Sequence, residues 1–292
     1  MHRAMLFILC TLMLTGCAMT STVPDTVRAE LAPTGTLRAG MNLGNTLFTG
    51  QDKATGELRG VSVDVMRELA ARLGVPLALV VHATPGEVAD AADKDTWDVA
   101  ILAIEQARAE KIEFSPAMTE IEASYMVHSD SKLKSVAEVD TAGTRISVAE
   151  KAGYELYLTR VLRHATLVKV KGFAAAIELF NAGGADALAS LKPNVLDATA
   201  QMPAARMLPG TFMTVNHGLG TPRPRPLAAQ YLKSFVEDLN ASGFVAASIA
   251  RHQVLGLAAV GAEGCREVAG SAATVASRRQ PSGPPWTTQI AN

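Results

Sequence analysis

Cysteine, aromatic residues and any excess of charge are scarce in this chain. Its 292 residues include three Cys and 5% aromatic residues, and the formal net charge is −1. A near-neutral chain with few aromatic rings lacks both the electrostatic footprint and the stacking surfaces of a nucleic-acid-binding protein. The six His have no metal-binding spacing. We therefore expect no metal, no cofactor and no nucleic-acid partner.

Long apolar runs are also missing. No run reaches the ~18 residues that a membrane-spanning helix requires. The apolar run over 4–14 follows a short basic start and ends in the letters LTGC at 14–17, which look like a bacterial lipobox. We therefore predict a lipoprotein signal peptide over 1–16, a lipid-bearing Cys17 and a Thr-, Ala- and Pro-rich tether over 17–32. An ordinary secretory signal that contains a cysteine is the alternative.

What the chain does contain is typical of a globular protein with two cores. Hydrophobic residues make up 48% and charged residues 19%, and the length suffices for two domains. Strand-like and helix-like segments alternate over 36–257, which favours an α/β fold with largely parallel sheets. Extended segments at 121–127 and 211–219 are expected to cross between two lobes as a hinge around a ligand cleft. The predicted parts are lobe 1 (33–123 and 217–258), lobe 2 (124–216) and a disordered tail (259–292).

The stretch 97–116 holds the most informative candidate for a binding residue. A buried strand over 98–102 leads into a helix-forming segment over 105–111, so free backbone N–H groups and a positive dipole end meet at one point. Arg108 lies one turn into that helix, where a guanidinium can grip a carboxylate through two parallel hydrogen bonds. For this segment alone, a solvated arginine on the helix surface is the alternative.

The order of motifs resembles that of the periplasmic solute-binding proteins of ABC transporters, family 3, the amino-acid-binding type. The resemblance rests on LRAGMN at 37–42, GELRGVSVDVMRELAARLGV at 56–75 and WDVAIL at 97–102. It implies a two-lobe periplasmic-binding-protein type II fold in which Arg108 clamps a ligand carboxylate. It also implies a membrane-anchored periplasmic lipoprotein that delivers a small-molecule ligand to an ABC permease. We expect a monomer.

The remaining binding positions of the family fall on residues that depart from its pattern. The position of the family's ammonium-binding Asp is Leu191, followed by Lys192. Two lysines are present where the family has neutral or acidic groups. A buried ammonium without a partner costs several kcal/mol, so the cleft is predicted to disfavour a zwitterion and favour an organic acid. The full set implied is Asn42, Asn45, Ile101, Ala103, Arg108, Lys151, Ala152, Gly153, Leu191 and Lys192.

Two alternatives to this anion-selective interpretation stay open. Lys151 and Lys192 point to solvent if the alignment slips by one residue. A nearby carboxylate, from Glu105, Glu150 or Glu155, would supply the missing partner of an ammonium group and would keep amino acids possible.

Three functional classes fit the resemblance. The first is the solute receptor of an ABC importer. The second is a cyclohexadienyl-dehydratase-like enzyme on the same fold, with Lys192 or Glu150 as acid or base; because the sequence shows no coupled catalytic pair, we expect a non-enzyme. The third is a sensory or partner-docking lipoprotein. Neighbouring permease and ATPase genes would support the first class.

Overall fold

The computed structural model describes residues 23–261, and strands and helices alternate along them. The strands are β1 (Leu37–Asn42), β2 (Gly50–Gln51), β3 (Leu58–Arg59), β4 (Leu77–His82), β5 (Val99–Ala103), β6 (Ile112–Phe114), β7 (Thr119–His128), β8 (Arg145–Ala149), β9 (Thr166–Val170), β10 (Ala187–Leu191), β11 (Ala205–Met207), β12 (Met213–Pro222) and β13 (Ala258–Ala259). The helices are α1 (Asp25–Leu31), α2 (Val61–Leu73), α3 (Pro85–Asp90), α4 (Gln106–Ala109), α5 (Gly153–Val161), α6 (Gly172–Asn181), α7 (Lys192–Gln201), α8 (Pro226–Ala241) and α9 (Phe244–Arg251). The predicted α/β class is confirmed.

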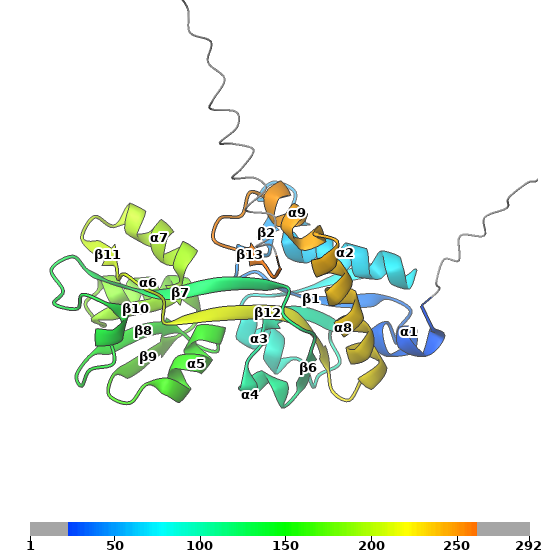
Figure 1. Ribbon diagram of the computed structural model, residues 1–292, viewed down its shortest axis with the longest axis horizontal. Coiled ribbons are helices and arrows are strands. Elements are labelled where there is room, and N and C mark those ends of the chain that lie inside the picture. Colours follow the sequence, from blue (N-terminus) through cyan, green and yellow to red (C-terminus); the bar gives the residue numbers. More distant parts are fainter. Residues whose placement is uncertain (1–22, 262–292) are drawn as a thin grey trace, which may run out of the picture.

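One long sheet runs through the molecule (Figure 1). Its strand order is β4-β1-β5-β12-β7-β10-β8-β9, with β6, β11 and β13 pairing alongside. Strands β4, β1 and β5 are mutually parallel, as are β10, β8 and β9, whereas β12 and β7 run antiparallel to their neighbours. The structure therefore consists of two parallel α/β units joined through two antiparallel strands.

Strands β7 and β12 lie where the sequence predicts the two crossovers. Figure 1 shows both as long ribbons in the middle of the molecule that pass from one half to the other. The first half of β7 pairs with β12 and its second half pairs with β10. Strand β12 in turn pairs first with β7 and then with β5. Each crossover strand therefore contributes to both units, and we propose the lobe limits 33–123 with 217–258, and 124–216.

Helical periodicity explains which residues form the core. In α2 the apolar side chains recur on one face, so that Val65, Leu69 and Leu73 are buried. Gly74 ends this helix in the left-handed conformation, with φ of 67°, and its N–H bonds back to the last turn. The packing of such helices against the sheet leaves the carboxyl ends of the strands free to form a site.

Residues 25–31 form a helix, which corrects the tether predicted over 17–32. Helix α1 packs on α8 and buries Val27 and Leu31. The Glu30 carbonyl accepts a hydrogen bond from Arg225 Nη1 at 3.0 Å, and the Glu30 carboxylate accepts one from the Ala228 N–H at 2.8 Å. The composition suggested a linker, but the two apolar residues four positions apart provide a face that can pack.

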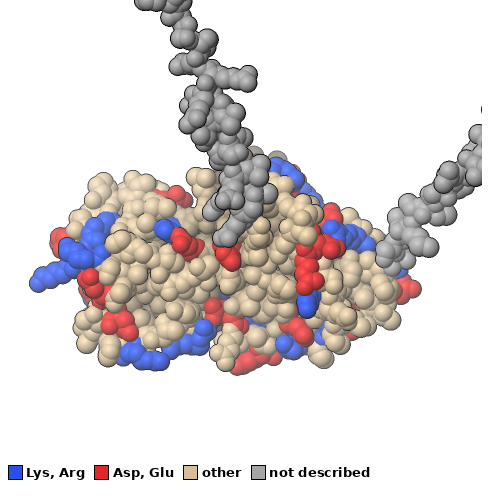
Figure 2. Space-filling view, viewed as in Figure 1, with Lys and Arg blue, Asp and Glu red and all other residues tan. Residues whose placement is uncertain are grey.

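The start of the predicted tail also belongs to the fold. Strand β13 pairs with β7, and the Val260 N–H donates to the Met118 carbonyl at 3.1 Å. The predicted signal peptide, Cys17 and residues 262–292 lie outside the described residues. Between residues 23 and 261, the structure has no helix that is long and apolar enough to cross a membrane. Figure 2 shows acidic and basic side chains interspersed over the visible face.

Candidate ligand-binding cleft

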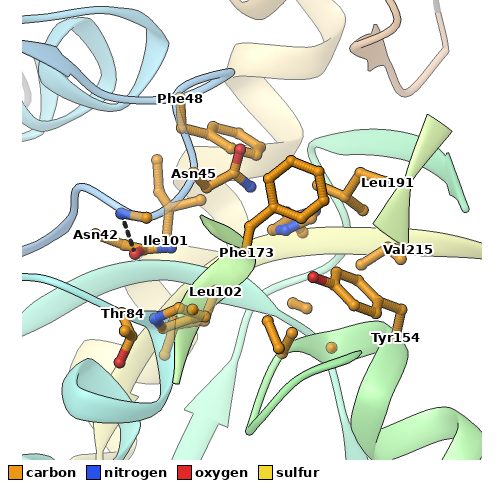
Figure 3. Close-up of a pocket in the computed structure, with 18 of the residues that line it drawn as sticks. Asn42, Asn45, Phe48, Thr84, Ile101, Leu102, Tyr154, Phe173, Leu191 and Val215 are labelled. Atoms are coloured by element: carbon orange, nitrogen blue, oxygen red, sulfur yellow. Dashed lines mark hydrogen bonds between the residues drawn. The ribbon is translucent and has the colours of Figure 1, made fainter. Parts of the chain in front are cut away.

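A cavity of about 80 Å³, partly open to solvent, lies between the two units. Its walls come from the segments that follow β1, β4 and β5 in one unit and β8, β9 and β10 in the other, because the carboxyl ends of these parallel strands face each other. Figure 3 shows the labelled side chains of Phe48, Phe173, Leu191 and Tyr154 around this space. Most of the lining area is apolar, as in small-molecule sites generally.

Eight of the ten predicted ligand contacts line this cavity. Residues that lie far apart in sequence meet there because the strands on which they were placed end at the same cleft. The eight are Asn42, Asn45, Ile101, Ala103, Arg108, Ala152, Gly153 and Leu191. Their contact with a ligand remains a prediction.

The two lysines do not line the cavity, and this corrects their predicted place in the site. Lys151 Nζ pairs with Asp90 on α3, and Lys192 Nζ pairs with the Glu122 carboxylate at 2.6 Å. Each ammonium group is paired with a carboxylate and remains in contact with solvent. Moving it into an apolar cavity would cost desolvation free energy. The prediction that the cleft prefers anions relied on these two lysines, so they no longer support it.

Arg108 is the buried charge of the cleft. Its residue is only 5% exposed, so it is not the solvated surface arginine considered as an alternative. Nη1 donates to the Ala103 carbonyl at 3.0 Å, and Nη2 donates to the Lys151 carbonyl at 2.8 Å in the other unit. Burial lowers the pKa of Arg108 to about 10, which leaves the guanidinium cationic at neutral pH. These two bonds use two of the five N–H groups of the guanidinium.

Helix α4, on which Arg108 lies, is shorter than predicted. It spans four residues instead of the seven expected over 105–111. A helix this short has little macrodipole, so the positive field at this point comes mainly from the guanidinium itself. The expectation that a helix N-terminus next to Ala103 helps to bind an anion is therefore only weakly supported.

Direct contacts hold the two units together around the cavity. A Cβ atom added to Gly153 would lie 2.6 Å from the Ala103 Cβ, so the start of α5 reaches the end of β5. Arg160 Nη1 lies 2.7 Å from the Glu105 carboxylate. Lys171 Nζ lies 2.9 Å from the Glu87 carboxylate. The structure is therefore that of the closed cleft.

The lobe 1 wall presents side chains that are already engaged locally. Asn42 Oδ1 accepts from the Gly44 N–H at 2.9 Å, as the dashed line in Figure 3 shows, and Asn45 Oδ1 accepts from the Leu47 N–H at 3.2 Å. The Thr84 hydroxyl caps α3. These bonds fix the loops after β1 and β4, and they use the oxygens of both asparagines, so that the amide nitrogens keep their capacity to donate.

The lobe 2 wall presents helix starts instead. Helices α5, α6 and α7 begin at or beside the cavity, and none of them has a side-chain cap at its N-terminus. The first-turn N–H groups of a helix have no partner within the helix, so uncapped starts offer backbone donors to a bound anion. Side chains on this wall, such as Ala152, Tyr154 and Phe173, mainly supply shape and apolar contact.

Of the three carboxylates considered for an ammonium group, one lines the cavity. Glu105 pairs with Arg160, and Glu155 pairs with Lys169 and accepts from the Lys151 N–H. Glu150 lines the cavity and is exposed at its rim. The cavity is therefore lined by one exposed carboxylate and one buried guanidinium, the two charges that complement an amino acid.

Several lining residues were not predicted from the sequence, among them Phe48, Thr84, Phe173, Asn194 and His217. Thr84 and Phe173 follow the ends of β4 and β9, so the rule that sites form at the carboxyl ends of parallel strands could have found them. Asn194 lies on α7, a helix that the sequence pattern did not indicate. His217 gave no local signal, because Thr214 and Asn216 are equally polar residues of the same extended segment.

A closed cleft between two α/β units that share two hinge strands defines a two-lobed ligand-binding protein. The chain belongs to the bacterial extracellular solute-binding proteins, family 3, whose family model matches residues 37–252. The predicted resemblance is thereby confirmed, and so is the two-lobe type II fold that it implied.

Individual relatives are distant. The glutamine-binding protein of Geobacillus stearothermophilus is 23% identical over 192 residues, which cover 64% of this chain and 72% of the relative. A mutant of ArgBP from T. maritima has a TM-score of 0.64 at 20% identity, over 77% of this chain and 98% of the other. The ancestral amino acid-binding protein AncCDT-1, a precursor of cyclohexadienyl dehydratase, has a TM-score of 0.62 at 23% identity, over 76% and 97%. At such identities the structural likeness concerns the fold.

Proposed function

We propose that this chain is the solute receptor of an ABC importer and that it binds a small carboxylate-bearing solute, an amino acid or a related organic acid. The observation that supports this most is Arg108, a buried guanidinium on the wall of a closed interlobe cavity. A buried cation in an apolar site favours an anionic group of the ligand. The names of the relatives, a glutamine-binding and an amino acid-binding protein, point to the same solute class.

Within that class, an α-amino acid is the first candidate. Its carboxylate would bind at Arg108 and the start of α5, and its ammonium group would face the rim carboxylate of Glu150. An organic acid is the competing ligand, since no second carboxylate lies in the deep part of the described cavity. The two solute classes differ by one ammonium group, which a binding screen can resolve.

A thermal-shift screen of the chain from residue 18 onward against amino acids and organic acids tests the proposal. A ligand at 100 times its Kd stabilises the folded protein by about 2.7 kcal/mol, which raises the melting temperature measurably. The proposal predicts a shift for at least one carboxylate-bearing solute. It would be contradicted if only uncharged solutes, such as sugars, produced a shift.

We further propose a periplasmic location with a lipid anchor at Cys17 and delivery of the ligand to a permease by a monomeric receptor. The lipobox-like letters at 14–17 support the anchor. Cys17→Ser should move the protein from the membrane fraction to the soluble periplasmic extract, because two or more acyl chains are what retains such a protein on a membrane. A wild-type protein whose mass shows no lipid would contradict the anchor. Adjacent permease and ATPase genes would favour transport over a sensory role.

The dehydratase-like alternative has less support. It needs an acid and a base that face the same space, and Lys192, one of its two candidates, pairs with Glu122 outside the cavity. Glu150 alone, exposed at the rim, forms no coupled pair with it. We therefore propose a binding protein and not an enzyme.

A further inference from the structure

The interlobe cavity is small for a site that would take every carboxylate-bearing solute. Its volume is about 80 Å³. A buried water needs about 10–15 Å³ of such space, so the cavity has room for about five to eight water-sized groups. Glycine, alanine and serine are solutes of that size, whereas glutamine and arginine are larger. The space between the lobes therefore restricts which solutes fit.

An aromatic side chain of lobe 2 points into this space. Phe173 lies in the first turn of α6 and lines the cavity. Figure 3 shows its ring directed into the cavity, between the labelled side chains of Asn45 and Leu191, which line the same space. A phenyl ring is rigid and bulky, so it occupies volume that a longer ligand would need.

The segment around Phe173 fixes the position of its ring. Phe173 packs against the apolar cluster of lobe 2 that contains Ala176, one turn further along α6. Gly172 has φ of 82°, a left-handed conformation that favours glycine, at the point where the chain enters α6. Lys171 Nζ lies 2.9 Å from the Glu87 carboxylate of lobe 1. The start of α6 is therefore held at the cleft from both lobes.

The closed cleft cannot widen without losing contacts between the lobes. Arg108 Nη2 donates to the Lys151 carbonyl at 2.8 Å across the cleft. Gly153 approaches Ala103 so closely that an added Cβ atom would lie 2.6 Å from the Ala103 Cβ. A solute too long for the cavity would separate these groups, and the lost contacts would weaken its binding.

We infer that Phe173 is a specificity-determining residue that sets an upper limit on ligand size. The site then takes small carboxylate-bearing solutes, such as glycine, L-alanine or L-serine, and disfavours longer ones, such as L-glutamine or L-arginine. This inference deepens the proposed function and rests on it, because it takes the cavity as the solute site.

A ratio of two dissociation constants tests the inference. Calorimetry measures a short set (glycine, L-alanine, L-serine and L-lactate) and a long set (L-glutamine, L-arginine and adipate), and the lowest Kd of the long set is divided by the lowest Kd of the short set. Both values come from the same protein, so a loss of stability in a variant does not by itself change the ratio.

The matched control is Phe212→Ala. Phe212 is a half-buried phenylalanine of lobe 2 that packs on Tyr125, with 4.5 Å between ring centroids, and it does not line the cavity. Phe212→Ala and Phe173→Ala therefore remove the same atoms from the same lobe, and only the second removes them from the cavity wall.

The wild type should bind a member of the short set most tightly. Phe173→Ala should lower the ratio by about tenfold or more, because the volume of the missing ring admits the longer chain. Phe173→Leu keeps an apolar side chain of smaller volume, so its ratio should lie between those of the wild type and Phe173→Ala. Phe212→Ala should keep the wild-type ratio.

Three results would overturn the inference about Phe173 and leave the proposed function standing. They are a wild type that binds a long solute most tightly, a ratio that Phe173→Ala leaves unchanged, and a ratio that Phe212→Ala lowers equally. If Phe173→Ala binds nothing, the ratio of Phe173→Leu decides in the same way. A wild type that binds neither set would contradict the proposed function, and the inference would fall with it. A lower ratio confined to the Phe173 variants supports both.

Discussion

The two walls of the cleft differ in what they offer to a ligand. The lobe 1 wall carries the charge and the amides, in Arg108, Asn42 and Asn45, and its loops are fixed by local hydrogen bonds before any ligand binds. The lobe 2 wall carries small and apolar side chains at the uncapped starts of α5, α6 and α7. One wall provides side-chain chemistry and the other provides backbone donors.

This difference suggests an order of events in binding. The lobe 1 wall can hold a solute while the cleft is open, because the loops that carry Asn42 and Asn45 are fixed by hydrogen bonds within lobe 1. Lobe 2 then contributes its N–H groups only when it closes, and Arg108 joins both walls through the carbonyls of Ala103 and Lys151. Affinity should therefore depend on lobe 1 chemistry and on lobe 2 shape, and substitutions can separate the two.

The largest effect on ligand affinity is expected when the Arg108 guanidinium of lobe 1 is removed. Arg108→Ala should weaken ligand binding by about 2–5 kcal/mol, because the ligand anion and the two carbonyls lose their donor. Calorimetry on the wild type and the variant measures this difference. Circular dichroism should show the fold retained, since Arg108 lies at the cavity and not in an apolar cluster. An unchanged Kd would contradict the prediction that Arg108 binds the ligand anion.

The second largest effect on affinity is expected where the lobe 2 wall meets lobe 1 at Gly153. Gly153→Ala places a methyl group against Ala103 at a distance that requires the walls to separate. Such overpacking costs about 1–3 kcal/mol in a well-packed site. Ligand affinity should fall while the ligand-free protein melts no earlier, since Ala suits a helix better than Gly. Adding Ala103→Gly should restore affinity; failure of this rescue would show that the walls do not meet there.

The third effect concerns pH and the hinge side of the lobe 1 wall. Burial, together with the nearby Arg108 guanidinium, lowers the folded pKa of His217 to about 3 from its ordinary value of 6.5, so the unfolded chain binds the extra proton between these values. Its contribution to stability is complete above pH 6.5 and is lost as the pH falls. Between about pH 7.5 and pH 5, the wild type should lose about 2 kcal/mol of unfolding free energy relative to His217→Leu. Parallel pH profiles in urea unfolding would contradict this.

The smallest effect is expected at the rim. Lys171 is largely exposed and pairs with Glu87 across the cleft, and its hydrogen bond holds the pKa of that carboxyl below its usual value. Exposed ion pairs contribute about 0–1 kcal/mol and are screened by salt. Lys171→Gln should therefore reduce ligand affinity at most severalfold, and less at high salt. A larger loss would mean that the rim pairs, and not the walls, control closure.

The fold could be predicted because its signals are local and repeated. The period of α2, its glycine cap and the apolar strands each favour the same α/β order. The elements that escaped prediction are short or lack a regular pattern, as in α3, α7 and the two-residue strands β2 and β3. Helix α1 was missed because its burial depends on α8, about 200 positions later in the chain.

The positions of site residues could be predicted where they depend on the ends of strands, but the directions of their side chains could not. Arg108, Gly153 and Leu191, which the family resemblance implied, line the cavity because each lies at or shortly after the end of a strand that reaches the cleft. Sequence could not show that Lys151 and Lys192 point elsewhere, since their carboxylate partners, Asp90 and Glu122, are 61 and 70 positions away. His217 was missed for the same reason, because its place on the cavity wall depends on Phe48 and Ala103, which lie more than 100 positions earlier in the chain.

The packing of α1 on α8 also shortens the tether between the folded protein and the proposed lipid. Only six residue steps separate Cys17 from Val23, which is buried in the apolar core, instead of the sixteen steps of a tether that continues to 33. At about 3.5 Å per residue this gives a reach of about 20 Å, compared with about 55 Å. The receptor would then search for its permease in two dimensions within a thin layer, at a correspondingly higher effective concentration.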